Sequence, residues 1–294
     1  MITINNNMYV LDTDNTSYVF AVLGSGQLEH LYYGRKLHAN EAVMTEKHTF
    51  IPGNTNVYNK DYSSYSLEDV CLEMSSLGKG DIREPFIEVT YTNGSSTTDM
   101  VFDRAEIIRG KEEYDTLPGS YDDNGEVEQL VIYLKDRNYN LTLELHYYVY
   151  EKCDIITRSA KLVNSGNESV RLERLMSMQL DLNESDFGLS FFNGAWAREM
   201  NRSRIPLRAG KYVNESVTGT SSNRANPFYM IGRSSTTEDY GECYGFNLIY
   251  SGNHYEAAQV NSYGKLRLVS GINPATFSYI IEAGKCFEAP EAVL

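Results

Sequence analysis

The clearest pattern of apolar and polar positions lies in the segment 141–150, Leu-Thr-Leu-Glu-Leu-His-Tyr-Tyr-Val-Tyr. Its odd-numbered residues are leucine, tyrosine or valine, and polar or amphipathic residues stand between them. Alternation with a period of two is typical of a β-strand that has one buried face. The segment therefore predicts a long strand whose odd-numbered side chains belong to a core.

Similar short apolar runs recur along the chain, and Gly, Asn, Ser or Asp residues separate them. Such a pattern favours many antiparallel strands joined by turns, with a meander over 130–163. The segments expected to form strands are 17–23, 28–33, 86–91, 100–102, 130–134, 141–150, 155–163, 170–182, 228–231, 242–250, 256–260, 265–269 and 277–281. Because Asn93-Gly94 is a strong hairpin signal, we expect 86–91 and 100–102 to pair with each other.

Two segments depart from the strand pattern. Leu67, Val70, Cys71, Met74 and Leu77 have a helical spacing, which predicts a short helix before Gly78. The segment 39–66 is polar and irregular and predicts a long loop.

Composition agrees with a fold made of strands. The chain of 294 residues contains 23 Tyr and 11 Phe, and aromatic residues are enriched in strands. Hydrophobic residues make up 41% and charged residues 22%, which is ordinary for a folded protein. The chain is long enough for one large all-β domain or two smaller ones.

Charge and terminal sequence restrict the partners and the location. The net charge of -14 disfavours nucleic acid and anionic membranes and is compatible with a neutral ligand. The N-terminal residues have no secretory signal and no stretch is long enough to cross a bilayer, so we expect a cytoplasmic protein. The four cysteines are far apart, and we expect reduced core thiols.

The segment 193–228 attracts attention because it contains Trp196, the only tryptophan. Small residues flank Trp196, and several arginines follow it in an otherwise acidic chain. We interpret the segment as a long functional loop that presents an aromatic ring. The alternative is that Trp196 is a buried core residue.

The sequence contains no recognisable catalytic motif. Forty acidic residues make any carboxylate pair uninformative, and the five histidines form no metal-binding motif, so we expect no metal and no cofactor. Neither a nucleophile elbow nor a phosphate-binding loop is present. Asp81 and Arg83 project to the same side of an extended chain and are expected to form an ion pair, either in a structural role or at the edge of a pocket.

An ordered set of motifs nevertheless resembles a known family, the N-terminal domain of bacterial glycoside hydrolase family 36 α-galactosidases. The resemblance covers nearly the whole chain. The motifs are Gly80-Asp-Ile-Arg-Glu-Pro85, Leu117-Pro-Gly119, Asp154-Ile-Ile-Thr-Arg-Ser159, Leu172-Glu-Arg174, Gly194-Ala-Trp-Ala-Arg-Glu199, Asn226-Pro-Phe228, Glu242-Cys-Tyr-Gly-Phe246, Tyr250-Ser-Gly-Asn253, Gly271-Ile-Asn-Pro274 and Pro290-Glu-Ala-Val-Leu294.

The resemblance implies an all-β fold, a β-supersandwich of two large antiparallel sheets like that of galactose mutarotase, with few or no helices. Residues 1–294 would form this N-terminal domain, and a catalytic (β/α)8 barrel would follow Leu294. The catalytic aspartates of the family lie in that barrel, within Lys-Trp-Asp and Ser-Asp-Asn patterns that this chain lacks. No residue of this chain is therefore expected to be catalytic.

The same resemblance implies that the domain supports the barrel, contributes to a homo-oligomer (a tetramer in the full-length enzyme), and contacts an α-galactoside oligosaccharide of the raffinose type. The enzyme would release α-galactose with retention. The residues expected at the sugar are Trp196, Arg198, Asn223 and Asn226. The sequence departs from the family pattern at Asn223, where histidine is common, and over 39–66.

Two other functions remain open from the sequence. The chain could be a stand-alone carbohydrate-binding module in which Trp196 and tyrosines stack on a sugar. It could instead be an epimerase related to the mutarotases, which needs a histidine and a carboxylate for proton transfer at the anomeric carbon. Among the histidines, only His146 lies on a strand that the pattern strongly predicts.

Overall fold

A computed structural model describes residues 1–38, 56–63, 66–111 and 113–294. In these ranges the chain forms twenty β-strands and three short 3-10 helices, and it forms no α-helix. The 3-10 helices are η1 (Lys60–Tyr62), η2 (Glu151–Cys153) and η3 (Pro274–Thr276). The all-β prediction is confirmed. No helix in the described part is long and apolar enough to cross a membrane.

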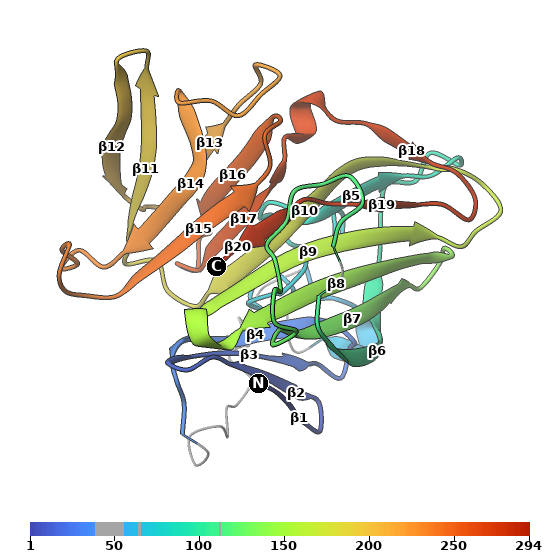
Figure 1. Cartoon of the computed structure of the whole chain (residues 1–294). Helices are drawn as coiled ribbons and strands as arrows, with labels where there is room; N and C mark the ends of the chain where they lie inside the picture. Colours follow the sequence, from blue (N-terminus) through green and yellow to red (C-terminus); the bar gives the residue numbers. More distant parts are fainter. Residues whose placement is uncertain (39–55, 64–65, 112) are drawn as a thin grey trace.

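The strands form three sheets, and neighbouring strands within each sheet are antiparallel. The largest sheet has ten strands in the order β12-β11-β14-β15-β20-β9-β8-β7-β6, and β19 pairs with β9 (Figure 1). Its strands are β6 (Met100–Arg109), β7 (Glu128–Asp136), β8 (Leu141–Tyr150), β9 (Ile155–Asn164), β11 (Gly188–Ala195), β12 (Arg198–Pro206), β14 (Ala225–Gly232), β15 (Cys243–Ile249), β19 (Cys286–Glu288) and β20 (Glu291–Val293).

The other two sheets are smaller. The six-stranded sheet has the order β13-β16-β17-β10-β18, with β5 also paired to β10. Its strands are β5 (Ile87–Thr90), β10 (Val170–Leu182), β13 (Gly210–Glu215), β16 (His254–Val260), β17 (Leu266–Ile272) and β18 (Tyr279–Ile281). The four-stranded sheet contains β1 (Ile2–Asn5), β2 (Met8–Asp12), β3 (Thr16–Val22) and β4 (Leu28–Arg35) in chain order.

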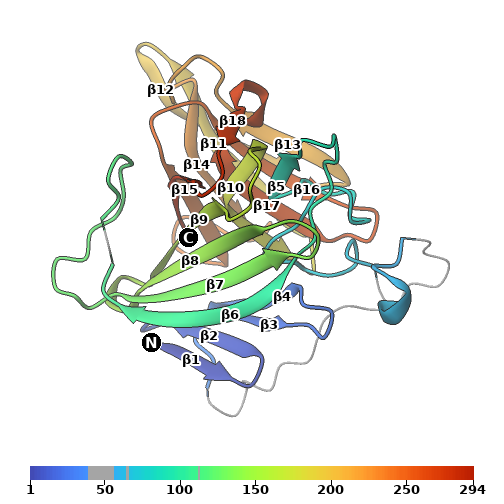
Figure 2. The ribbon, with the colours of Figure 1, turned by 90° about the vertical axis from the view of Figure 1, so that its right-hand side faces the viewer.

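One large core joins the three sheets. The odd-numbered side chains of β8, from Leu141 to Val149, are all buried in it, as the alternation predicts. They meet Leu172 and Leu268 of the six-stranded sheet and Phe20 of the four-stranded sheet in the same cluster. Figure 2 shows the four-stranded sheet below strands β6 to β8. The fold is therefore a β-sandwich of two large sheets with an added N-terminal sheet.

The predicted strands are present, but the hairpin at Asn93-Gly94 is wrong in its partners. β5 pairs with β10, whereas β6 pairs with β7 in another sheet. The turn itself forms, because Gly94 N–H donates to Tyr91 O and Tyr91 N–H to Ser95 O, both at 2.9 Å. Local turn chemistry was correct, and the choice of strand partner was decided by distant residues.

The short helix predicted at 67–77 is also wrong. Arg83 binds the carbonyl oxygens of Leu67 and Val70 at 2.9 and 2.8 Å, and Asp181 accepts from Leu72 N–H at 2.9 Å. These distant side chains satisfy backbone groups that a helix would pair internally. The segment instead forms turns that lie against the six-stranded sheet.

Two further predictions concern the cysteines and the segment 39–66. Only Cys71 is a buried thiol, and burial raises its pKa to about 12. Cys153, Cys243 and Cys286 are exposed, so the prediction of core thiols is wrong for three of the four. Most of the long loop predicted over 39–66 lies outside the described residues; within the described part, Asn59 caps η1.

Candidate functional site

Trp196 lies at the tip of the hairpin formed by β11 and β12, which projects from one end of the ten-stranded sheet (Figure 1). Ala195 pairs with Arg198, so Trp196 and Ala197 form a two-residue turn. Ala197 has a left-handed backbone (φ 57°), and its N–H donates to Glu199 Oε1 at 2.8 Å. Trp196 is 91% exposed, which excludes the core interpretation for this conformation.

The segment 193–228 is not a long loop. It contains the end of β11, all of β12 and β13, and the beginning of β14. Alternation is weak here because one face of the hairpin is not covered by a core, and most residues of β12 are exposed. The presentation of Trp196 therefore depends on paired strands and not on an irregular loop.

Gly194 allows a second segment to pack against this hairpin. A Cβ atom on Gly194 would lie 2.4 Å from Arg198 O, which is closer than real Cβ atoms come, and 3.1 Å from Asn223 O, which is a tight contact. The absent side chain thus permits the turn before β14 to contact the hairpin backbone.

The structure gathers the four predicted sugar-contact residues at this end of the sheet. Arg198 and Asn223 are exposed, on the hairpin and on the turn packed against it. Asn226 is half-buried, and its Nδ2 donates to Phe192 O at 3.4 Å. They lie at the same end of the sheet as Trp196, and a role in sugar binding stays a prediction.

Three residues that the sequence did not single out form hydrogen bonds at the beginning of β14. Asn214 Nδ2 donates at 2.7 Å both to Asn226 O and to Glu256 Oε2. His254 Nε2 lies 2.9 Å from Ala225 O and donates to it. The only signal in the sequence was the presence of His254 and Glu256 in an apolar strand. The backbone of Ala225 and Asn226 is thereby fixed by side chains from the other large sheet.

Asp81 and Arg83 form the predicted ion pair, and both side chains are buried. Asp81 accepts from Arg83 Nε and Nη2 at 2.9 Å, and both side chains are at most 2% exposed. Arg267 Nη2 lies 2.8 Å from Asp81 Oδ2 and 2.7 Å from Asp181 Oδ2, so the cluster has two arginines and two aspartates. Burial alone would raise the pKa of the Asp81 carboxyl, but Arg267 and Arg83 overcome this effect and lower it.

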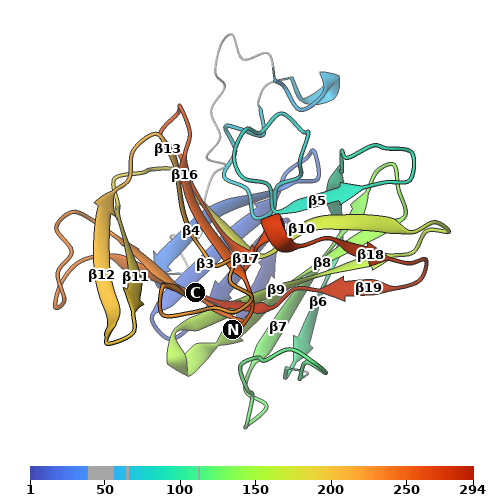
Figure 3. The same cartoon turned by 90° about the horizontal axis from the view of Figure 1, so that it is seen from above.

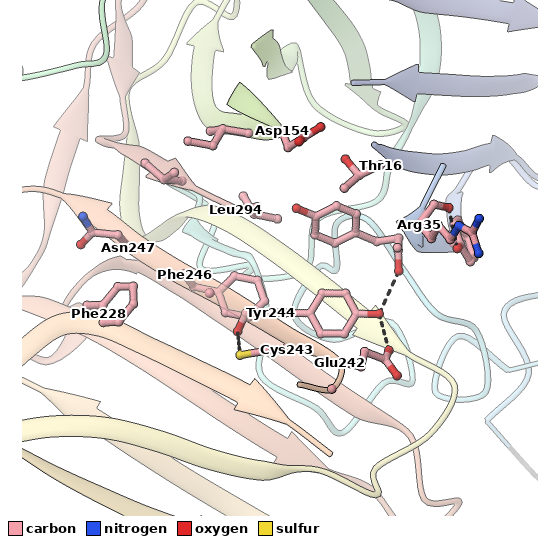
Figure 4. Close-up of a pocket in the computed structure, with 17 residues that line it drawn as sticks. Thr16, Arg35, Asp154, Phe228, Glu242, Cys243, Tyr244, Phe246, Asn247 and Leu294 are labelled. Carbon is pink, nitrogen blue, oxygen red and sulfur yellow. Dashed lines mark hydrogen bonds between the residues drawn. The ribbon is translucent and has the colours of Figure 1, made fainter. Parts of the chain in front are cut away.

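The largest pocket described, of about 730 Å³, lies between β4, β15 and the last residues of the chain (Figure 4). Phe228, Tyr244, Phe246 and Leu294 supply much of its apolar lining. The Tyr244 hydroxyl lies 2.9 Å from Tyr33 O and 2.7 Å from Glu242 Oε1. The pocket thus combines an aromatic floor with a fixed polar edge, and it does not include Trp196.

The described residues contain no group of three or more His, Cys, Asp or Glu side chains that could hold a metal ion. His146, which the epimerase hypothesis singled out, lies on β8 with Nδ1 2.8 Å from Gln129 Nε2. Its Nε2 is 3.4 Å from Glu144 Oε2. These two groups are in contact and leave no space for a sugar between them.

Comparison with known proteins gives a consistent result. Residues 26–282 match the model of the glycosyl hydrolase family 36 N-terminal domain. The chain is 35% identical to α-galactosidase AgaA of Geobacillus stearothermophilus over 97% of its own length and 39% of the relative. It is 31% identical to α-galactosidase 1 of Pediococcus pentosaceus over 98% of its own length and 40% of the relative.

Solved structures agree with these relatives. The α-galactosidase of Lactobacillus brevis superposes with a TM-score of 0.93 at 35% identity, covering 99% of this chain and 40% of that one. A variant of AgaA in complex with stachyose superposes with a TM-score of 0.93 at 33% identity, covering 97% and 40%. The chain spans about two fifths of the length of these proteins. Because the family model matches residues 26–282, the chain belongs to the glycosyl hydrolase family 36 N-terminal domain family.

Proposed function

We propose that this chain is the N-terminal domain of an α-galactosidase that acts on raffinose-type oligosaccharides with retention, and that residues 1–294 work beside a catalytic (β/α)8 barrel. The proposal is supported by relatives that are named α-galactosidases, and by structures of AgaA variants with stachyose and raffinose. Within this chain, the observation that most supports the proposal is Trp196, which is 91% exposed at the tip of the β11–β12 hairpin.

The role that we propose for Trp196 is stacking on the sugar beyond the scissile bond. A pyranose has an apolar C–H face, and an indole ring covers such a face over a large area. The ring of Trp196 is 91% exposed and therefore accessible to a sugar. Arg198, Asn223 and Asn226 lie at the same end of the sheet, and we propose that they offer hydrogen-bonding groups to the sugar hydroxyls.

Replacing Trp196 by Ala in the complete enzyme is expected to raise the KM for raffinose about tenfold, the equivalent of about 1.4 kcal/mol of lost binding. The melting temperature should hardly change, since exposed substitutions alter stability by about 0.5 kcal/mol or less. Steady-state kinetics and a thermal melt measure both effects. Tyr240→Ala, which removes a ring that is 77% exposed from the β14–β15 loop, is the matched control.

The stacking role fails if Trp196→Ala leaves the KM for raffinose unchanged. A loss of stability together with unchanged kinetics would assign Trp196 to a packing role in the assembled protein. An equal rise of KM in the Tyr240→Ala variant would show that the effect is unspecific.

The chain of 294 residues is itself expected to fold and not to hydrolyse α-galactosides. It has its own core, whereas the catalytic aspartates of the family belong to the barrel. A chromogenic α-galactoside provides the assay. Turnover well above the blank that survives repurification would place a catalytic carboxylate pair within these residues.

Other parts of the proposal concern assembly. The pocket between β4 and β15 offers an apolar surface that suits contact with the catalytic domain, and β12 is an open sheet edge of the kind that takes part in assembly. Homo-oligomerisation as a tetramer and cytoplasmic location stay predictions. The alternative of a stand-alone carbohydrate-binding module makes the same use of Trp196 and needs no partner domain. Contact between His146 and Glu144 weakens the epimerase alternative.

A further inference from the structure

Three turns meet at the end of the sandwich far from the hairpin of Trp196. They follow β5, join β7 to β8, and join β9 to β10, and they enclose a pocket of about 490 Å³. Figures 1 and 3 place β5 and β18 at one end of the molecule and β11 and β12 at the other. A ligand in this pocket would therefore be separate from the surface described above. We call it the Tyr139 pocket, after the aromatic residue that lines it.

Tyr139 presents an aromatic face in this pocket. Its ring is stacked on Tyr91, with 3.5 Å between ring centroids and 10° between ring planes. Tyr91 is buried, whereas Tyr139 is half-buried. Tyr91 thus covers one face of the Tyr139 ring, and Tyr139 remains partly exposed where it lines the pocket.

The position of Tyr139 is fixed by several hydrogen bonds. Asp136 Oδ1 accepts from the backbone N–H groups of Asn138 and Tyr139 at 2.8 and 2.9 Å. Asn93 Nδ2 donates to the Tyr139 hydroxyl at 3.1 Å. Ser165 N–H donates to Asn140 O at 2.9 Å and joins two of the turns. The ring is thus held in place before any ligand arrives, which reduces the entropy that binding would cost.

The third turn is fixed by a buried amide. Asn164 Oδ1 accepts from Gly166 N–H at 3.0 Å, and its Nδ2 donates to Glu168 O and Ile281 O at 2.8 and 3.0 Å. Thr92 Oγ1 donates to the Glu168 carboxylate in the neighbouring turn. All three turns are therefore tied to one another or to the sheets.

Three amide side chains at this pocket are available for a ligand. Asn138, Asn140 and Asn167 are exposed, and within the described ranges none makes a side-chain hydrogen bond. Each amide can both donate and accept, as a sugar hydroxyl also does. Among the lining residues Glu168 is the sole charged one, so no cation is available to attract an anion.

We propose that the Tyr139 pocket is a second carbohydrate-binding site, which takes one neutral pyranose unit of an oligosaccharide. The ring of Tyr139 would stack on the C–H face of the sugar, and the amides of Asn138, Asn140 and Asn167 would bind its hydroxyls. The volume lies in the range of small-molecule sites. The proposal does not depend on Trp196, and the site would hold oligosaccharide near the enzyme without taking part in hydrolysis.

Titration of the 294-residue chain with galactose and with raffinose, followed by amide NMR shifts, tests the proposal. We expect shifts in all three turns. The dissociation constant should be about tenfold higher for Tyr139→Ala than for the unmodified chain. Tyr139→Phe keeps the ring and should retain binding. Tyr121→Ala, which removes an exposed ring elsewhere, and Trp196→Ala should leave the shifts of the three turns unchanged.

The variant with both Asn138→Ala and Asn167→Ala tests binding with little risk to folding. Both side chains are exposed, and neither makes a side-chain hydrogen bond to the described residues. It should weaken sugar binding while the amide spectrum remains that of a folded protein. Unchanged affinity in this variant and in Tyr139→Ala would overturn the proposal. So would sugar-induced shifts confined to the β11–β12 hairpin, or equal shifts produced by inorganic phosphate.

Discussion

Replacing Arg83 by Met is expected to destabilise the folded chain by about 3–5 kcal/mol, the usual result of removing one partner from a buried ion pair. Arg83 is 2% exposed and contacts Asp81 and Asp181, with the latter 3.1 Å from Nη1. Without it, two buried carboxylates share Arg267 as their remaining arginine. One negative charge then lacks compensation among side chains that are at most 2% exposed.

Arg83 also supports the backbone of the segment that crosses the six-stranded sheet. Its Nη2 donates to Leu67 O and Val70 O, and methionine cannot replace these bonds. The expected loss therefore includes two carbonyl groups without a donor. The result would be measured as a fall in the free energy of unfolding in urea.

Two controls separate charge from packing. Arg171→Met removes a side chain that is 55% exposed and 3.8 Å from Glu173, and it should cost less than about 1 kcal/mol. The double variant with Asp81→Asn and Arg83→Met keeps the cluster neutral, so its loss should be smaller than the sum of the two single losses. Strict additivity of the single losses would contradict the view that these residues act as one electrostatic unit.

Part of this cluster was predictable from the sequence and part was not. Asp81 and Arg83 are two residues apart, so their proximity was predictable from an extended backbone. Asp181 and Arg267 are opposite each other in the pairing of β10 with β17. That pairing depends on register between strands far apart in the chain, and no local pattern revealed it.

The same distinction applies to the strands. The alternation in 141–150 was sufficient to predict β8 and its buried face, because one complete face is apolar. The partner of β5 was not predictable, since Asn93-Gly94 specifies a turn and does not specify which strand continues the sheet. The helical spacing at 67–77 was misleading because side chains from elsewhere bind its backbone.

For the candidate site, the sequence suggested residues and could not determine their exposure. A lone tryptophan between small residues is compatible with a core or with a surface. Exposure of Trp196 results from a hairpin that extends beyond the covering sheets. The supporting residues Asn214 and His254 come from the second large sheet, so only the packed structure connects them to Asn226 and Ala225.

Glu256, which lies below the hairpin, has an unusual environment. It is 2% exposed, and its Oε2 accepts from Asn214 Nδ2 at 2.7 Å. Its Oε1 has no hydrogen-bond partner among the described residues, and the neighbouring His254 Nδ1 is 3.9 Å away. Burial raises the pKa of the Glu256 carboxyl well above its usual value, and burial lowers the pKa of His254. The Glu256 carboxyl therefore keeps its proton to higher pH than an exposed carboxyl does, and His254 becomes protonated only at a lower pH than an exposed histidine does.

The raised pKa has a definite consequence for stability. In the unfolded chain Glu256 ionises near its ordinary pKa of about 4.5, whereas the folded chain retains the proton to higher pH. Its contribution to stability is thus fully present below that pH and is lost as the pH rises towards the folded pKa. The loss amounts to at most about 1.4 kcal/mol for each pH unit in this interval.

Glu256→Gln is therefore expected to stabilise the folded chain, with a gain that grows as the pH rises from 5 to 8. The amide keeps an oxygen for Asn214 and adds an N–H group that can donate to the lone pair of His254 Nδ1. Urea unfolding at several pH values measures the difference. Glu282→Gln, which changes an exposed carboxylate, should give a small difference that does not depend on pH in this way. A difference between Glu256→Gln and the unmodified chain that stays constant across this pH range would show that Glu256 is already ionised in the folded state. Asn214, which donates to Asn226 O, would then also donate to a buried negative charge.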